Sequence, residues 1–142
     1  MNKLLFFLFM LFFSCSKKNI SNQCSFLANI DVFYEINLNL PQYNQLNFIS
    51  NSIIIPNIGN GGIIVTNSGT GFLAWDASDP NHISNPSCSS MSIIGGIESL
   101  CNCADENSYS LITGQSLNIA LECGLKPYRV ELNGNNLLIS SF

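Results

Sequence analysis

Short apolar segments with a two-residue period, each closed by turn-forming residues, constrain the fold of this chain more than any other feature. Over 32–40 every second residue is apolar, and the positions between them include Glu35, Asn37 and Asn39. This alternation is typical of a β-strand with one buried face. Pro41 follows and ends the pattern, because proline lacks the N–H that a strand ladder needs.

Eight further segments predict strands, because they are apolar, rich in β-branched or aromatic residues, and bounded by Gly, Asn, Ser or Pro. They span 52–55, 62–66, 72–75, 92–94, 97–100, 109–112, 128–132 and 137–140. Turn-forming residues at 67–71, 95–96 and 133–136 stand between them at hairpin spacing. No window longer than a turn or two has a helical period with caps. The expected fold class is therefore all-β, an antiparallel sandwich or barrel.

The N-terminal residues predict export. Lys3 precedes ten apolar residues at 4–13, which as a helix would rise about 15 Å, roughly half of a bilayer core. The run is therefore expected to be the core of a secretion signal. Cys15, directly after Ser14, resembles the lipid-modified cysteine of a bacterial lipobox. An ordinary signal peptide with a chance cysteine is the alternative.

The expected organisation is a signal peptide over 1–14, the lipidated Cys15 with a polar tether over 15–24, and one domain over 25–142. Lipid on Cys15 would hold the protein to a membrane. The expected location is the cell envelope, at the periplasmic side of the outer membrane, with an unidentified envelope protein as partner. Removal of Lys3 with the signal leaves four basic residues against nine acidic ones. Binding to nucleic acid is excluded, because it requires a basic face.

Five cysteines follow Cys15, and an oxidising compartment makes them disulfide candidates, with one left over. The only histidine of the chain is His82. Together with Cys88, Cys101 and Cys103 it offers ligand types that suit zinc. The spacing of Cys101 and Cys103 is shorter than usual for zinc, and the compartment favours disulfides. No metal is therefore expected.

A series of motifs follows Trp75 along the chain. They are Asp79-Pro80-Asn81-His82, Cys101-Asn102-Cys103-Ala104, a strand with Tyr109, the turn Thr113-Gly114, the segment Leu125-Lys126-Pro127-Tyr128-Arg129-Val130, and the turn Asn133-Gly134. In this order they resemble the Rieske domain family. The resemblance covers about residues 50–142 and implies a Rieske-like antiparallel β domain. It also implies that two loops, 79–91 and 101–108, form a common tip.

The resemblance identifies the positions that would hold a 2Fe–2S cluster. A Rieske centre binds one iron through two thiolates and the other through two imidazoles. The corresponding positions are Asp79 (or Pro80), His82, Cys101 and Ala104, of which only His82 and Cys101 are of the right kind. The ordinary cluster is therefore not expected, and neither is another cofactor.

Simpler roles are also open to the loop residues. Asp79 fits an Asx-turn with Pro80 next to it, and His82 fits a histidine of that turn. Asp76, Asp105 and Glu106 fit solvated loop charges. No catalytic residue is identified, because the single histidine has no identifiable nucleophile or acidic partner.

By the same resemblance, Cys88 and Cys103 occupy the places of a disulfide that links the two ligand loops. Cys24 with either Cys123 or Cys101 would be a second bond. The expected function is a lipid-anchored binding or structural module without a cluster, rather than an enzyme. The alternative is a ferredoxin-like electron-transfer component, with a 2Fe–2S or altered metal centre at 79–82 and 101–104.

Overall fold

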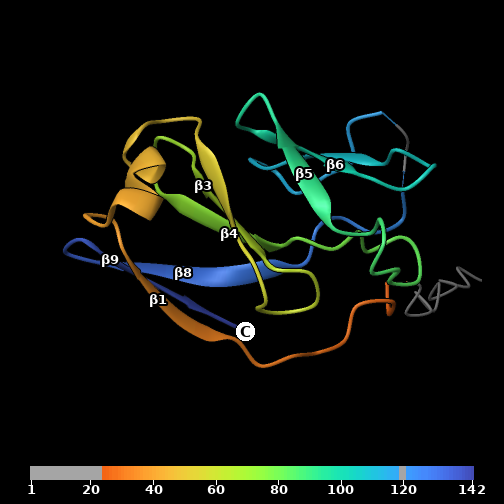
Figure 1. Cartoon of the computed structure of the whole chain (residues 1–142), viewed down its shortest axis with the longest axis horizontal. Coiled ribbons are helices and arrows are strands. Elements are labelled where there is room, and N and C mark those ends of the chain that lie inside the picture. The colour runs from red at the N-terminus through yellow and green to blue at the C-terminus, as the bar shows by residue number, and fades with distance from the viewer. Residues whose placement is uncertain (1–23, 119–120) are drawn as a thin grey trace, which may run out of the picture.

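The computed structural model describes residues 24–118 and 121–142, so the signal segment and Cys15 lie outside the described residues. The strands are β1 (Phe33–Asn37), β2 (Ser52–Ile55), β3 (Ile63–Asn67), β4 (Phe72–Asp76), β5 (Met91–Ile94), β6 (Glu98–Cys101), β7 (Ser108–Ser110), β8 (Pro127–Asn133) and β9 (Asn136–Ser140), and a 3-10 helix, η1 (Pro41–Asn47), lies between β1 and β2 (Figure 1). Within the described residues, no helix is long and apolar enough to cross a bilayer.

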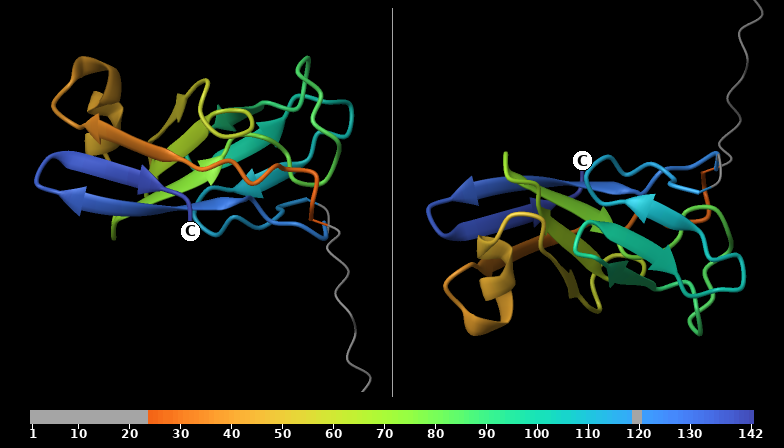
Figure 2. Two further views of the ribbon diagram at one scale, coloured as in Figure 1. Left: turned by 90° about the horizontal axis from the view of Figure 1, so that it is seen from below. Right: turned by 90° about the horizontal axis from the view of Figure 1, so that it is seen from above.

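The strands form two antiparallel sheets. The larger has the order β1-β9-β8-β4-β3-β2, and the smaller has the order β5-β6-β7. β1 pairs along its whole length with β9, which joins the first and last strands of the domain. Figure 2 shows η1 and the β8–β9 turn at one end of the molecule and the loops of the smaller sheet at the other. The expected all-β antiparallel fold is confirmed.

Two hydrophobic cores lie on opposite faces of β3. Ile63 and Val65 belong to the core formed with β1, η1, β8 and β9, whereas Ile64 belongs to the core beside the smaller sheet. All three side chains are fully buried. A strand buried on both faces carries a continuous apolar run rather than an alternating one, which explains the Ile-Ile-Val segment in the sequence.

The predicted strands agree with the structure except near their ends. β1 has the expected faces, with Ile36 buried and Phe33 and Glu35 exposed. β7 is shorter than predicted, because a turn with Gly114 at φ +73° replaces its second half. The helix η1 was not predicted. It begins at Pro41, which fits the first turn of a helix, and it buries Leu46 in the larger core.

Candidate functional site

Two loops of the smaller sheet lie together at one end of the molecule (Figures 1 and 2). The first loop, residues 77–90, connects β4 to β5, and the second, residues 102–107, connects β6 to β7. A disulfide between Cys88 and Cys103 joins them, with a Cα–Cα distance of 4.8 Å. This is the pair that the family resemblance implies. We call the two loops together the tip.

A second disulfide joins Cys24 to Cys123, one of the two pairings that sequence left open. It attaches the first described residue to the tip, because Asn81 of the first loop binds both the carbonyl oxygen and the N–H of Cys123, at 2.7 and 3.1 Å. Cys101 is then the free thiol among the described cysteines, and it is buried.

Asp79 is a fully buried carboxylate at the start of the tip. Its Oδ1 accepts the N–H of Asn81 at 2.8 Å, which is the expected Asx-turn. The same oxygen accepts the hydroxyl of Tyr109 at 2.7 Å, and Oδ2 accepts the amide of Asn107 at 2.9 Å. Burial, followed by the hydrogen bond to Asp79, raises the pKa of Tyr109, so the phenol stays protonated. Through its bonds to Tyr109 and Asn107, Asp79 ties the first loop to β7 and to the second loop.

His82 follows in the first loop and is partly exposed. Its Nδ1 lies 3.0 Å from the carbonyl oxygen of Ile83, which can only accept, so this nitrogen carries the proton of the neutral ring. The lone pair of Nε2 is then directed into the tip, 3.2 Å from Sγ of Cys101. The same nitrogen lies 3.5 Å from Oδ2 of Asp79 and 3.7 Å from Oδ2 of Asp105.

Cys101 ends β6 with its side chain fully buried. Burial is the main reason why the pKa of its thiol rises to about 11, and the charges of Asp79 and Asp105 act in the same direction. The thiol is therefore protonated at neutral pH and is a poor nucleophile.

The four cluster-ligand positions do not fit an ordinary 2Fe–2S cluster. Ala104 is exposed in the second loop and offers no donor atom. Cys103, the nearest additional sulfur, is bonded to Cys88. Asp79 offers a carboxylate where this cluster needs a thiolate, and hard oxygen ligands do not replace soft sulfur ligands well. Within the described part of the chain, His82 and Cys101 are the donors of the right kind at these positions, and a Rieske centre needs two of each.

Asp105 and Asn107 belong to the site although sequence reasoning treated Asp105 only as a solvated charge. The amide nitrogen of Asn107 donates to Oδ2 of Asp79 and to Oδ2 of Asp105, at 2.9 Å each. Asp105 remains partly exposed at 41%. No sequence signal identifies this pair of contacts, because they depend on how the second loop folds back over the first.

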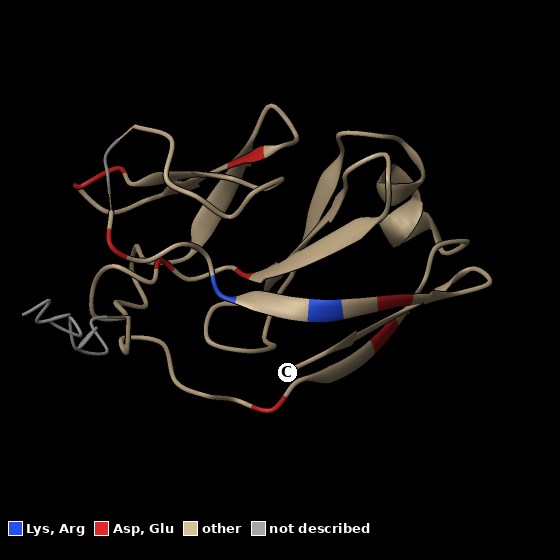
Figure 3. Cartoon of the chain, turned by 180° about the vertical axis from the view of Figure 1, so that it is seen from behind, with Lys and Arg blue, Asp and Glu red and all other residues tan. Residues whose placement is uncertain are grey.

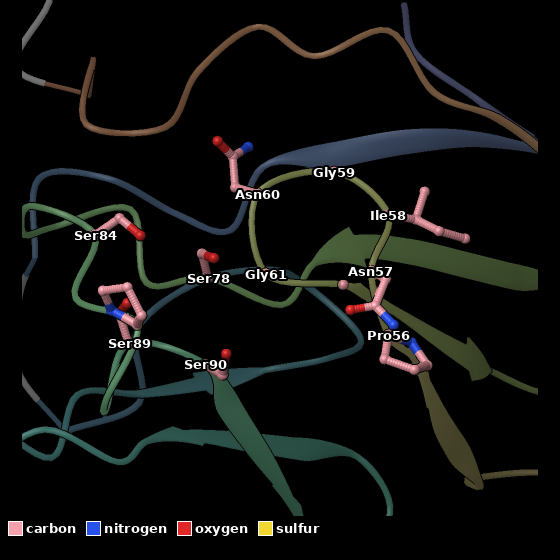
Figure 4. A pocket seen from close by; sticks show the side chains of 12 residues that line it. Pro56, Asn57, Ile58, Gly59, Asn60, Gly61, Ser78, Ser84, Ser89 and Ser90 are labelled. Carbon is pink, nitrogen blue, oxygen red and sulfur yellow. The ribbon is translucent and has the colours of Figure 1, made fainter.

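A separate pocket of about 340 Å³ lies between the first loop and the β2–β3 connection (Figure 4). Its lining side chains are those of Pro, Asn, Ile and Ser, without a titratable group. The expectation that Asp76 is a solvated loop charge is wrong, because it ends β4 and is fully buried. Its carboxylate holds the neighbouring 60–61 backbone, accepting hydrogen bonds from Asn60, Gly61, Ser78 and Tyr128. The pocket lining offers no acid–base chemistry.

Charge is sparse on the described surface. The basic residues of the described ranges are Lys126, directly before β8, and Arg129, within it, and all nine acidic residues lie in the same ranges. Figure 3 shows the acidic residues spread over several elements. The described residues form no basic face of the kind that nucleic acid requires.

The two disulfides and the buried Cys101 predict a thiol titration. In a Cys15→Ala chain, we expect no reaction with a thiol reagent at pH 8 in the folded state and one thiol per chain in urea. Because the pKa of about 11 lies above the ordinary 9.0, folding favours the protonated thiol. This contribution to stability is lost as the pH rises from 9 to 11. The further substitution Cys101→Ser should abolish the reaction with the thiol reagent in urea. Three reactive thiols per Cys15→Ala chain in urea would contradict the two disulfide pairings.

The comparisons with known proteins bear on the fold. No family model matches the chain, and no curated protein matches it by sequence. A solved structure titled as the complex of reduced oxygenase and oxidized ferredoxin in carbazole 1,9a-dioxygenase is 12% identical, with a TM-score of 0.50, over 77% of this chain and 93% of that chain.

Two further solved structures are similar. One is the ferredoxin of carbazole 1,9a-dioxygenase from Nocardioides aromaticivorans, 12% identical with a TM-score of 0.48 over 76% of this chain and 98% of that chain. The other is described as the NADH-dependent nitrite reductase small subunit from Mycobacterium tuberculosis, 12% identical with a TM-score of 0.44 over 80% of this chain and 98% of that chain. The fold is Rieske-like, and the first of the three structures shares it.

Proposed function

We propose that this protein is a lipid-anchored component of a bacterial cell envelope whose Rieske-like domain has lost its cluster and acts as a binding or structural module. The observation that carries the proposal is the donor set at the tip. His82 and Cys101 stand alone as donors of the right kind, with Asp79 and Ala104 at the other two positions. One histidine in the whole chain cannot supply the two imidazoles of a Rieske iron.

The tip is held by interactions that need no cofactor. The disulfide between Cys88 and Cys103 links its two loops, and the buried carboxylate of Asp79 binds Tyr109 and Asn107. Such a network rigidifies a loop when every member is satisfied. These contacts would keep the shape of the tip in a domain without a cluster.

The same rigidity supports a role in binding. The side chain of Ile83 is 76% exposed in the first loop, and Pro86 is exposed nearby. A loop already held in one conformation loses little entropy when it meets a partner. We propose that an envelope protein contacts the tip at these residues.

Iron and acid-labile sulfide, measured with a visible spectrum, test the loss of the cluster. The full-length chain would be produced under anaerobic, iron-replete conditions and purified with its disulfides intact. We expect a folded, colourless protein without stoichiometric iron. A brown protein with equal amounts of iron and sulfide would contradict the proposal.

Electron transfer is the second candidate function. Its support is the fold and the 3.2 Å approach of His82 Nε2 to Cys101 Sγ between the two ligand loops. This candidate requires a redox-active centre in the purified protein. The same spectrum decides it, because a protein without absorbance above the near ultraviolet has no iron–sulfur centre to transfer electrons.

Lipid anchoring is tested at Cys15. We expect radiolabelled fatty acid to be incorporated into the wild-type chain and the protein to sediment with membranes. Cys15→Ala should abolish labelling and membrane attachment, whereas Cys101→Ser should leave both unchanged. Export of unlabelled protein in a soluble form would instead identify an ordinary signal peptide with a chance cysteine.

A further inference from the structure

Donor atoms of different chemistry converge inside the tip from three parts of the chain. Nε2 of His82 comes from the first loop, Sγ of Cys101 from the end of β6, and Oδ2 of Asp105 from the second loop. Together with Sγ of Cys103 these atoms all lie within 4.8 Å of one another. Cys103 is engaged in a disulfide. The remaining donors are an imidazole, a thiol and a carboxylate, with the carboxylate of Asp79 next to them.

We propose that His82, Cys101 and Asp105 bind one divalent cation of the zinc class, with Asp79 at the fourth position. Zinc bonds of about 2.0–2.3 Å in tetrahedral geometry place neighbouring donor atoms about 3.3–3.6 Å apart. The distances from Nε2 of His82 to the sulfur and to the two carboxylate oxygens are 3.2, 3.5 and 3.7 Å. These spacings lie within about 0.4 Å of the edges of such a tetrahedron, so small side-chain movements would bring the donors to ligand distance.

The partners of the donors orient them toward a common point. Nδ1 of His82 donates to the carbonyl oxygen of Ile83, which leaves Nε2 free to ligate. Asn107 donates to both carboxylates, and Tyr109 binds the second oxygen of Asp79. Hydrogen bonds of this kind fix the orientation of ligands in metal sites.

The charge of the two carboxylates and the access of the site to solvent also favour a bound cation. Two carboxylates accept from one amide nitrogen, and no Lys or Arg side chain is paired with either of them among the described residues. A cation between them would relieve their repulsion. Cys101 and Asp79 are fully buried, whereas His82 and Asp105 retain 23% and 41% side-chain exposure. The ion can therefore enter from the side of His82 and Asp105.

The mixture of donors selects the class of ion. Calcium and magnesium require oxygen ligands, and an iron–sulfur cluster requires more thiolates than the one that Cys101 offers. Imidazole, thiolate and carboxylate are all established zinc ligands, and the ion would bind Cys101 as its thiolate with release of the thiol proton to solvent. The sequence offered Cys88 and Cys103 as zinc ligands beside His82 and Cys101, but these two cysteines are bonded to each other. The carboxylates of Asp79 and Asp105 take their places in the proposed site. This inference goes beyond the proposed function and requires no partner.

Cobalt(II) tests the site, because its tetrahedral thiolate complexes absorb in the near ultraviolet and the visible. Full-length protein with intact disulfides would be treated with a chelator and titrated with Co²⁺ alone, then with Zn²⁺ as competitor. We expect saturation at one Co²⁺ per chain, both groups of bands, and complete displacement by Zn²⁺. An absence of a thiolate band at saturating Co²⁺ would overturn the proposal.

Variants locate the ion. Cys101→Ser should remove the near-ultraviolet band, and His82→Gln and Asp105→Asn should each weaken binding about tenfold or more. Asp105 and His82 are partly exposed, so these variants are expected to fold. Glu106→Gln, which removes a neighbouring exposed charge, is the matched control and should bind as the wild type does. Equal binding by Asp105→Asn and the wild type would place the ion elsewhere and overturn the assignment.

The outcomes separate this proposal from the proposed function. A protein without iron that also fails to bind Co²⁺ would refute the metal site and leave the cluster-free module standing. A protein purified with iron and sulfide would refute the loss of the cluster, and it would refute the mononuclear site as well.

Discussion

Asp76→Ala is expected to lower the free energy of unfolding by about 3–5 kcal/mol. The carboxylate of Asp76 is completely buried and accepts five hydrogen bonds. Its donors are the backbone and side-chain amides of Asn60, the backbone N–H groups of Gly61 and Ser78, and the hydroxyl of Tyr128. Truncation leaves these donors unpaired in the interior, where each costs about 1–3 kcal/mol unless it relaxes to water.

Urea unfolding of Asp76→Ala and the wild type measures this loss. Asp31→Ala removes an exposed acid just before β1 and is the matched control; it should unfold within about 0.5 kcal/mol of the wild type. Asp76→Asn should also destabilise the protein. Both carboxylate oxygens of Asp76 accept hydrogen bonds, and the amide nitrogen of the substituted side chain would face donors at one of these positions. A wild-type midpoint for Asp76→Ala would show that the 60–61 backbone is held by other contacts.

Loss of the disulfide between Cys24 and Cys123 is expected to have a comparable effect. The bond closes a ring with a sequence separation of 99 residues, which in the chain-entropy model stabilises the fold by about 4.7 kcal/mol. A double variant, Cys24→Ser with Cys123→Ser, avoids a new free thiol that could exchange. Its unfolding in urea should show this loss, and its far-ultraviolet circular dichroism spectrum in the folded state should match that of the wild type.

The bond at the tip provides the comparison. Cys88 and Cys103 are separated by 15 residues, for which the same model gives about 3 kcal/mol. The variant without this bond should therefore be the more stable of the two double variants. The reverse order would mean that strain or contacts of the folded state outweigh ring size.

The fold class followed from the sequence because strand periodicity is a local property. The alternation before Pro41 placed Ile36 inside and Phe33 outside, as the structure has them. The turn at Gly134, with φ +61°, lies between β8 and β9 as its Asn-Gly signal predicts. The helix η1 was not predicted, because it is a single 3-10 segment stabilised by burial of Leu46, and no local hydrophobic period indicates that burial.

The candidate site was less predictable, because it depends on contacts between loops. A resemblance to a family placed His82 and Cys101 together and paired Cys88 with Cys103. The partners of Asp79 could not be foreseen in the same way. Asn107 and Tyr109 reach it from 28 and 30 residues away, respectively, and their hydrogen bonds require both sheets to be in place.

The position of the disulfide at Cys24 has a consequence for the orientation of the domain. Cys123 lies against Asn81 of the first loop, so the chain leaves the domain at the tip (Figure 1). Cys15 precedes Cys24 by nine residues, a length of at most about 32 Å. With lipid on Cys15, as proposed, the tip would face the bilayer and the β8–β9 turn would point away from it. A partner that contacts the tip would then have to be embedded in the membrane or lie within a few nanometres of its surface.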